Sequence, residues 1–487
     1  MAKHKMSTFE RLTSGRLSRN ERRGWTEKLS STDPGLSIVH PNAGGIDVGN
    51  ESHFVAVPPD RDPKPVREFG CWTADLLLMA QWLTDCRVDT VALQATGVYW
   101  IPLFDILTQR GIQVTVVNAQ HTRNLPGRKS DVQESQWLMK LHTYGLVRNS
   151  FQLPEQIESL RTIWRLRDRH VKEAGRCLQH MQKALTKMNI QLANVFTDIS
   201  GVSSQTIIAA VLGGERDPYV LADLKHERAP ASREEVARSL EGHWREDVLF
   251  ELRQAVDCYH FFRKQMSECD IQLEIYLAKI PGRTIDPPGS SATVSEPPKA
   301  PKKGRPGKKP KGNAPAFDIK PELARIAGVD LTTIDGIDVM TAQTFLAEIG
   351  ADLSAFPTED HFASWLGLTP CKDISGGKVI GRGPRKVQNR VAMSLRMAAT
   401  TLLNSKSYLG AQYRHLRSNL NSKPSAVKAM ARRLAVLIYR LVTKGQGWVD
   451  QGAARFENKK AKSDLASLST KAAARGFKLV PIEPLPQ

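Results

Sequence analysis

Between Asn42 and Tyr144 the sequence alternates short β-rich runs with amphipathic helical stretches, and this alternation most constrains the fold. The runs GGIDVG, SHFVAVP and VREFGCW precede a helical stretch at 74–86, VDTVALQA precedes another at 100–109, and IQVTVVNA precedes a third at 130–144. Strands that alternate with helices are joined by crossovers. We therefore expect an α/β domain built on a largely parallel or mixed sheet.

The pattern changes at Leu153. From there to about Leu192, apolar residues recur at spacings of three and four among many charges, which is typical of a long amphipathic helix or coiled coil. This stretch predicts a spacer or a dimer seam. A second helical region is expected from Ser203 to about Ile280, and helical patterning resumes at Leu323.

Composition marks the boundaries between these regions. Nine prolines and the basic run PKKGRPGKKPKG lie between Pro281 and Pro315, so this segment predicts a disordered insertion. We divide the chain into a basic flexible arm (1–40), an α/β domain (41–150), a helical or coiled-coil region (151–282), a Pro- and Lys-rich insertion (283–318), a mainly helical C-terminal domain (319–450) and a polar tail (451–487).

Charge and cysteine usage restrict the class of protein. The 69 Lys and Arg residues against 50 Asp and Glu give a formal charge of +19, which favours a polyanionic partner. The six cysteines are scattered without a CxxC pair, so we expect buried thiols in a reducing cytosol rather than disulfides or a zinc site. No apolar run approaches the roughly 18 residues of a membrane span, and we expect a cytoplasmic protein that does not bind membranes.

Four positions are ordered as a metal-dependent nuclease requires. Asp47 ends the first predicted strand, Gln94 ends the fourth, and Asp131 and Glu134 share one face of the helix at 130–144. In open α/β sheets, ligands bind at the carboxyl ends of the strands. Carboxylate oxygens are suitable ligands for Mg²⁺. Taken singly, a strand-end Asp is commonly a turn residue and an acid pair is usually a solvated helix face. Together the four have the layout of an RNase H-like nuclease core.

A second cluster lies between Cys371 and Arg390, in CKDISGGKVIGRGPRKVQNR. Here Ser375 precedes two glycines and a run of cations. A hydroxyl among freed backbone amides and guanidinium groups suits attack on a phosphodiester, whose negative charge rises in the transition state. A plain basic turn explains the local composition equally well. Earlier in the chain, IDGIDV at 334–339 is typical either of a DNA-contacting hairpin between two helices or of a simple interhelical turn.

Taken in order, several segments resemble the DEDD transposases of the IS110 family, particularly its IS1111-like branch: GIDVGNESHFVAVP, ALQATGVYWIPLFDIL, VVNAQHTRNLPGRKSDVQESQWLMKLHTYGLV, DISGVSSQTIIAAVLGGERDP and ASWLGLTPCKDISGGKVIGR. The resemblance covers about Asn42 to Asp450. It implies a RuvC-like, RNase H-like domain joined through a coiled coil to a transposase domain with a catalytic serine. It also implies a recombinase of an insertion sequence, guided by a structured noncoding bridge RNA that pairs with donor and target DNA, and acting as a homodimer or homotetramer.

The resemblance places the four family acids on Asp47, Gln94, Asp131 and Glu134, and the covalent nucleophile on Ser375. It implies that Mg²⁺ is held by Asp47, Asp131 and Glu134. The expected nucleic-acid-binding residues are Gly376, Lys378, Arg382, Arg385, Lys386, Asn389 and Arg390. The chain departs from the family at Gln94, which replaces a carboxylate, at Glu134, where Asp is usual, and in the long proline-lysine segment.

Two other functions remain open at the level of sequence. One is a junction-resolving nuclease that hydrolyses DNA with water, for which Ser375 is dispensable. The other is a nucleic-acid-binding protein that has lost its chemistry, consistent with Gln94.

Overall fold

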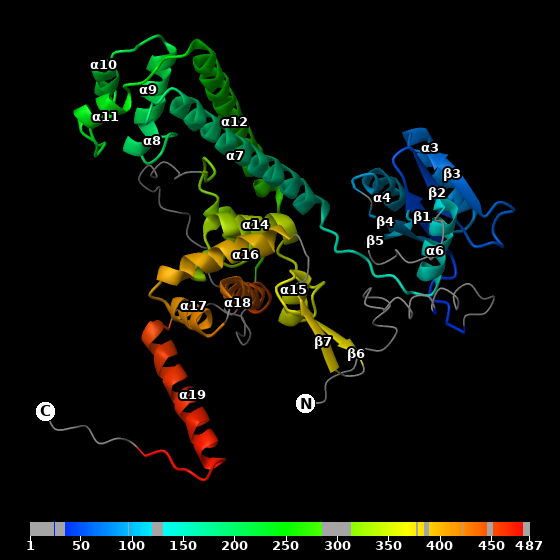
Figure 1. Cartoon of the computed structure of the whole chain (residues 1–487). Coiled ribbons are helices and arrows are strands. Elements are labelled where there is room, and N and C mark those ends of the chain that lie inside the picture. The colour runs from blue at the N-terminus through cyan, green and yellow to red at the C-terminus, as the bar shows by residue number, and fades with distance from the viewer. Residues whose placement is uncertain are drawn as a thin grey trace. The chain divides into compact units, whose positions relative to one another are not determined.

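The computed structural model describes residue 24 and residues 35–95, 97–118, 130–284, 313–375, 378–383, 389–420, 422–445 and 451–480, without the side chains of 371–383. The chain divides into two compact units, Met1–Gln152 and Leu153–Gln487. Each is described by itself below (Figure 1).

The first unit is built on a mixed five-stranded sheet. Its strands are β1 (Ala43–Val48), β2 (Ser52–Ala56), β3 (Val66–Gly70), β4 (Thr90–Gln94) and β5 (Gln113–Val117), in the order β3-β2-β1-β4-β5. β2 runs antiparallel to both β1 and β3, whereas β4 is parallel to β1 and to β5. The expected mixed sheet is confirmed.

Three described helices accompany this sheet: α3 (Thr73–Asp85), α4 (Trp100–Gln109) and α6 (Asp131–Thr143). Ile46 and Val48 of β1 lie in one apolar cluster with Leu76 and Met79 of α3 and Leu103 of α4. Successive strand residues point to opposite faces. The intervening residues of β1 therefore face the other side of the sheet.

The segment just before β1 is packed, although we expected a flexible arm as far as residue 40. The backbone amides of Val39 and His40 both donate to the carbonyl of Thr143, over 2.9 and 3.0 Å. The His40 ring stacks on His142 with centroids 4.6 Å apart, and Leu36 packs near Trp137. Contacts with the end of α6 thus order residues that lack any periodic pattern of their own.

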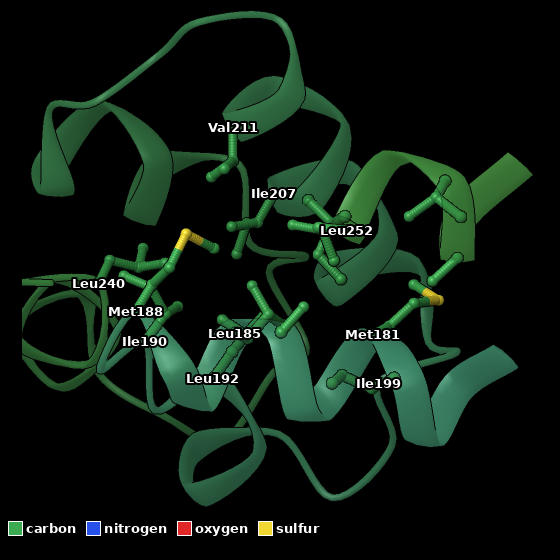
Figure 2. Packing of buried hydrophobic residues seen from close by; sticks show 14 of the residues in the cluster. Met181, Leu185, Met188, Ile190, Leu192, Ile199, Ile207, Val211, Leu240 and Leu252 are labelled. Carbon is green, nitrogen blue, oxygen red and sulfur yellow. The ribbon is translucent and has the colours of Figure 1, made fainter. Parts of the chain in front are cut away.

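The second unit contains two long helices, α7 (Glu155–Lys187) and α12 (Glu246–Lys279). The period of the sequence predicted α7, and α12 forms the last part of the second helical region that we expected. Between them the chain forms α8 (Leu192–Val195), α9 (Val202–Leu212), α10 (Pro218–Asp223) and α11 (Arg233–Ser239). Figure 2 shows their apolar side chains, among them Met181, Ile207 and Leu252, converging in one core. The short helices therefore cover the apolar faces of α7 and α12.

A buried ion pair joins the long helices. Arg167 of α7 is 1% exposed and donates to both carboxylate oxygens of Asp270 on α12. Arg167 also donates to the carbonyl of Asn313, and Asp270 accepts from the amide of Ala316. Residues 313–316 are thereby tied to the helix pair, although we expected folded structure to resume only at Leu323.

The rest of this unit is mainly helical. Its elements are α13 (Lys320–Ala327), η1 (Leu331–Thr333), α14 (Val339–Ile349), α15 (Glu359–Trp365), α16 (Arg390–Thr401), η2 (Leu402–Asn404), α17 (Tyr408–Asn419) and α18 (Lys423–Lys444). Two strands, β6 (Cys371–Ser375) and β7 (Lys378–Gly383), form an antiparallel hairpin. The polar stretch after residue 451, expected as a tail, contains the helix α19 (Ala453–Ala473).

The described cysteines are all free: Cys71, Cys86, Cys177, Cys258 and Cys269. Burial was predicted for every thiol, and it is wrong for Cys71 and Cys258, which are exposed. Among the residues that the structure describes, none forms a helix with the length and apolar character needed to cross a membrane.

Candidate nuclease site

The register of β1 and β4 brings the first two candidate residues side by side. Ile46 pairs with Leu93, so Asp47 and Gln94 come next along these parallel strands, at the carboxyl edge of the sheet. Partners in a parallel register point to the same face. Asp47 and Gln94 therefore share the face opposite to the apolar cluster that contains Ile46 and Leu93.

Helix α6 covers this face, and a glycine allows it to lie very close. A Cβ placed on Gly45 would approach the Ser135 carbonyl oxygen and the Met139 amide nitrogen to less than 3.0 Å. Gly45 and Asp47 are two residues apart on one strand and point the same way. The close packing of α6 on Gly45 thus puts the helix over the Asp47 side of the sheet.

Glu134 of α6 reaches Gln94 directly. The Gln94 side-chain amide nitrogen donates a hydrogen bond of 2.7 Å to a carboxylate oxygen of Glu134. Gln94 is only 6% exposed and Glu134 is half-buried. The structure therefore brings together a strand-end amide and a helix carboxylate from positions 40 residues apart, beside the strand end that carries Asp47.

Asp131 occupies a different environment on the same helix. It is the first residue of α6 and is exposed, and the preceding Ser130 caps the helix by accepting a hydrogen bond from the Gln133 amide. An acid in the first turn interacts favourably with the helix dipole. Asp131 therefore has a structural role whether or not it binds a ligand.

The far end of α6 is fixed to β4 by a second polar contact. The buried His142 ring nitrogen Nε2 lies 2.8 Å from the Thr90 hydroxyl. Burial, with a smaller contribution from the neighbouring His40, lowers the pKa of His142 to about 4. With Gln94 contacting Glu134 and Thr90 contacting His142, α6 runs antiparallel to β4 and is held at both ends.

Sequence patterns did not indicate this second contact. Both residues are buried and polar, and the only signal that Thr90 offers is a polar residue at the start of a strand whose three central residues are apolar.

The donor chemistry at this edge suits a hard divalent cation. Asp47 and Glu134 supply carboxylate oxygens, and Gln94 supplies an amide, while Mg²⁺ is commonly held by one or two carboxylates together with substrate phosphates. No group of three or more His, Cys, Asp or Glu side chains is gathered tightly enough to hold a metal ion among the described residues. A cation held by Asp47 and Glu134 would therefore need further ligands, such as the oxygens of a phosphate group.

Part of the second candidate cluster lies in the β6–β7 hairpin. Ser375 is the last residue of β6 and pairs with Lys378 of β7, and Arg382 lies further along β7. Gly376, Arg385 and Lys386 lie outside the described residues.

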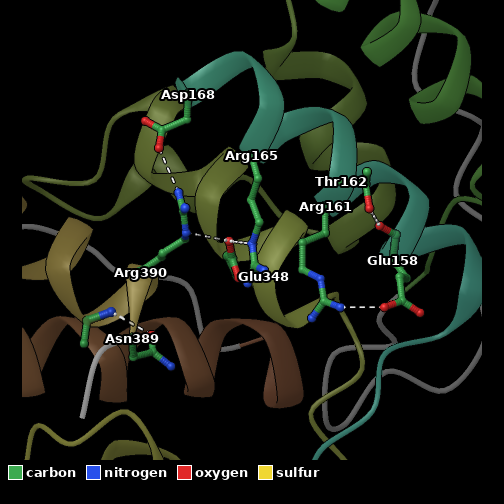
Figure 3. A network of polar contacts seen from close by, with 9 residues as sticks. Glu158, Arg161, Thr162, Arg165, Asp168, Glu348, Asn389 and Arg390 are labelled. Carbon is green, nitrogen blue, oxygen red and sulfur yellow. Dashed lines mark hydrogen bonds and ion pairs between the residues drawn. The ribbon is translucent and has the colours of Figure 1, made fainter. Parts of the chain in front are cut away.

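The two remaining residues of this cluster stand at the start of α16. Asn389 caps the helix by accepting a hydrogen bond from the Ala392 amide. Arg390 donates to Asp168 of α7 over 2.8 Å and lies 3.7 Å from Glu348 of α14 (Figure 3). Both residues therefore have partners within the protein, which the sequence did not predict.

Glu348 is the centre of this polar network. Arg165 of α7 donates to both of its carboxylate oxygens, over 2.8 and 2.6 Å, and these bonds raise the pKa of Arg165. The side chain of Glu348 is 9% exposed. Because Glu348 contacts cations from α7 and α16, it ties the chain that follows the hairpin to two other helices of the unit.

Comparison with known proteins finds similarity to transposases in two segments of the chain. Residues 44–190 match a transposase model of the DEDD type named for IS110, and residues 330–414 match the model of the Transposase IS116/IS110/IS902 family. A 116-residue stretch is 27% identical to the uncharacterized 43.6 kDa protein of insertion element IS110 from Streptomyces coelicolor, covering 24% of this chain and 28% of that protein. In residues 44–190 and 330–414 the chain thus carries the domains of an IS110-family transposase.

Proposed function

We propose that this transposase is an RNA-guided DNA recombinase of an insertion sequence, in which Ser375 forms a covalent bond to DNA and an acidic site binds Mg²⁺. The observation that carries the proposal is the meeting of Asp47, Gln94 and α6 at one sheet edge, within a segment that matches a DEDD transposase. The order β3-β2-β1-β4-β5, with β2 antiparallel, supports an RNase H-like, RuvC-like core.

Asp47, Glu134 and the exposed Asp131 are the residues that would hold the cation. When bound, Mg²⁺ neutralises charge on a phosphodiester and favours an oxygen nucleophile beside it. Gln94 orients Glu134 through their hydrogen bond. The anchored ends of α6 keep Glu134 over the sheet edge, so that binding a phosphate does not require the helix to move.

Ser375 supplies the nucleophile in this proposal. Its hydroxyl oxygen forms a bond to phosphorus while the bond from phosphorus to one sugar oxygen breaks, and the serine proton ends on that sugar oxygen, which leaves as a free hydroxyl. One phosphoester replaces another, so the bond energy is kept for rejoining. Its place at the end of β6, with Lys378 as its pairing partner in β7, supports a serine held at a strand end.

We further propose that the nucleic-acid surface comprises Gly376, Lys378, Arg382, Arg385, Lys386, Asn389 and Arg390. The formal charge of +19 supports contacts with both DNA and a guide RNA. We also propose that the protein assembles as a homodimer or homotetramer and acts inside the cytoplasm. Within the family, we propose that it belongs to the IS1111-like branch.

A second candidate is a nucleic-acid-binding protein without activity. It is favoured by Gln94, because an amide nitrogen that donates to Glu134 occupies a direction from which a cation would approach that carboxylate. On this alternative, neither Asp47 nor Ser375 affects function.

The test is recombination between a donor and a target plasmid in cells that express the noncoding RNA flanking the gene. We expect junctions with the wild type and none with Ser375→Ala or Asp47→Ala. Ser418→Ala and Asp60→Ala, at exposed positions of α17 and the β2–β3 loop, serve as matched controls and should retain activity.

The outcomes separate the candidates. Activity of Ser375→Ala with loss in Asp47→Ala would show a water-using nuclease. Wild-type binding of DNA and RNA without any junctions would favour the inactive protein. Junctions in the absence of the RNA would refute guidance but leave the serine chemistry standing.

A further inference from the structure

Helix α19 lies outside both segments that match transposase families, and most of it is exposed. Its first turns are held by Phe456, whose ring meets Tyr408 and His415 of α17 edge-on at 5.3 and 5.8 Å. None of its residues is buried. Figure 1 shows α19 extending from α17 over several turns. Most helical stability in proteins comes from packing of an apolar face rather than from intrinsic propensity, so the exposed face of α19 calls for a partner.

One face of α19 carries a stripe of mostly apolar residues with alternating spacings of four and three. The stripe consists of Ala454, Asn458, Ala461, Leu465, Leu468 and Ala472. Leu465 is 62% exposed and Leu468 is 53% exposed. Phe456 lies on the opposite side of the helix, since 3.6 residues complete one turn. The contact with α17 therefore leaves the stripe open to another molecule.

We propose that α19 pairs with α19 of a second copy of this chain as a parallel two-stranded coiled coil. The spacing of the stripe is that of a heptad seam, with Asn458, Leu465 and Ala472 at a positions and Ala454, Ala461 and Leu468 at d positions. This inference rests on the helix alone and does not depend on the chemistry proposed above.

The charges beside the seam fit a parallel pair. Glu457 precedes an a position and Lys462 follows a d position, which are the g and e sites that face each other across a parallel coiled coil. In an antiparallel pair centred on the helix, Lys462 would face its own copy and so would Asp464. The parallel arrangement joins opposite charges twice, whereas the antiparallel one offsets its two Glu457–Lys471 contacts with like-charge contacts at Lys462 and at Asp464.

Asn458 gives a second reason for this orientation. A single Asn at an a position specifies register and a two-stranded state, because the two amides hydrogen-bond across the axis only when the helices are parallel and in register. The seam has two leucines and is otherwise built from small residues, so pairing will be weak in isolation. The free energy of this pairing will add to that of any contacts that other parts of the chain make between the two copies.

Disulfide trapping in the full chain tests the arrangement. Ala461→Cys puts a thiol at a d position, where the two copies meet, and Ser463→Cys puts one on the outer face of the same turn. Under mild oxidation we expect a peptide linking Cys at 461 to its own copy, identified by mass spectrometry, and little linkage at 463. Leu465→Asp with Leu468→Asp should abolish the link at 461 and raise the dissociation constant at least about tenfold.

A charge exchange tests the orientation. With Ala461→Cys present, Glu457→Lys alone and Lys462→Glu alone should each slow linkage, because each homodimer then faces like charges. Mixing the two variants should restore it, because the mixed pair again faces opposite charges on both sides. Equal linkage at 461 and 463, with no effect of the two Asp substitutions, would overturn the proposal. Slow linkage in the mixture would overturn the parallel orientation.

Discussion

The side-chain amide of Gln94 donates a hydrogen bond of 2.7 Å to the carboxylate of Glu134. These are the two positions at which the chain departs from the four-acid pattern that the sequence suggested, and the structure places them in direct contact. A neutral amide beside a carboxylate leaves the pair with one negative charge rather than two. The pair is therefore stable without a cation, and Gln94 sets the position of Glu134.

Restoring a carboxylate at position 94 should make the site depend on metal. In Gln94→Glu two carboxylates meet at hydrogen-bonding distance, and their repulsion should lower the free energy of unfolding of the first unit by about 1–3 kcal/mol in a chelator. Mg²⁺ binding between them should reverse the loss, because a ligand that binds only the folded state stabilises it. Thermal unfolding with EDTA and with Mg²⁺ measures both effects.

Gln133→Glu provides the control for this change. It makes the same substitution one residue away from Glu134 at an exposed position of α6, and its unfolding temperature should respond to Mg²⁺ as the wild type does. An equal response of Gln94→Glu and Gln133→Glu would show that positions 94 and 134 do not share a cation.

The proximity of Asp47 and Gln94 could be predicted because the carboxyl ends of adjacent parallel strands lie at one edge, whatever the details of packing. The helix at 100–109 was likewise predicted with the bounds that the structure shows, since an amphipathic period is a local signal. The contact of Gln94 with Glu134 could not be predicted. It depends on how closely α6 lies on the sheet, which the absence of a Cβ at Gly45 decides.

Two other features escaped prediction for different reasons. The partners of Arg390 come from α7 and α14, far away in sequence, so its role in joining helices could not be predicted from neighbouring residues, whereas its contact with nucleic acid stays a prediction. Helix α19 looked like a tail because its seam uses alanine at three of six places, which weakens the hydrophobic period.

Gly45→Ala should displace α6. The added methyl group would press against the backbone of Ser135 and Met139, which cannot turn away as a side chain can. We expect a loss of about 3 kcal/mol or more in the stability of the first unit, and loss of recombination. Gly44→Ala is the matched control: its methyl group points to the other face and meets the Val91 and Val88 side chains at 3.0 and 3.3 Å. Denaturant unfolding of both variants should show the smaller loss in Gly44→Ala.

His142 should make the first unit sensitive to acid. Its folded pKa, about 4, lies below the usual 6.5 because the ring is buried. Below pH 6.5 the unfolded chain binds a proton that the folded chain does not. The free energy of unfolding of the first unit is therefore highest above pH 6.5. It falls by about 3 kcal/mol in total as the pH decreases from 6.5 through about 4. Hydrogen exchange of α6 amides between pH 7 and 4, corrected for intrinsic rates, measures this loss.

His142→Gln removes the titrating group and retains a hydrogen-bonding partner for Thr90. Over the same pH range its α6 amides should lose much less protection than those of the wild type. His180→Gln, at an exposed position of α7, should leave the wild-type dependence unchanged. If His142→Gln and the wild type lost protection in parallel, another group would be responsible.

We predict that the ion pair of Arg167 with Asp270 stabilises the second unit and holds residues 313–316 in place. Asp270→Asn leaves the guanidinium in a site that is 1% exposed without its counter-charge, which should destabilise the second unit by about 3–5 kcal/mol. Arg167→Met with Asp270→Leu removes both charges and should recover part of this loss. The recovery should be incomplete, because the Asn313 carbonyl and the Ala316 amide also lose their partners. Faster hydrogen exchange at Ala316 in both variants would show that this pair holds the returning chain, and unchanged exchange there would contradict it.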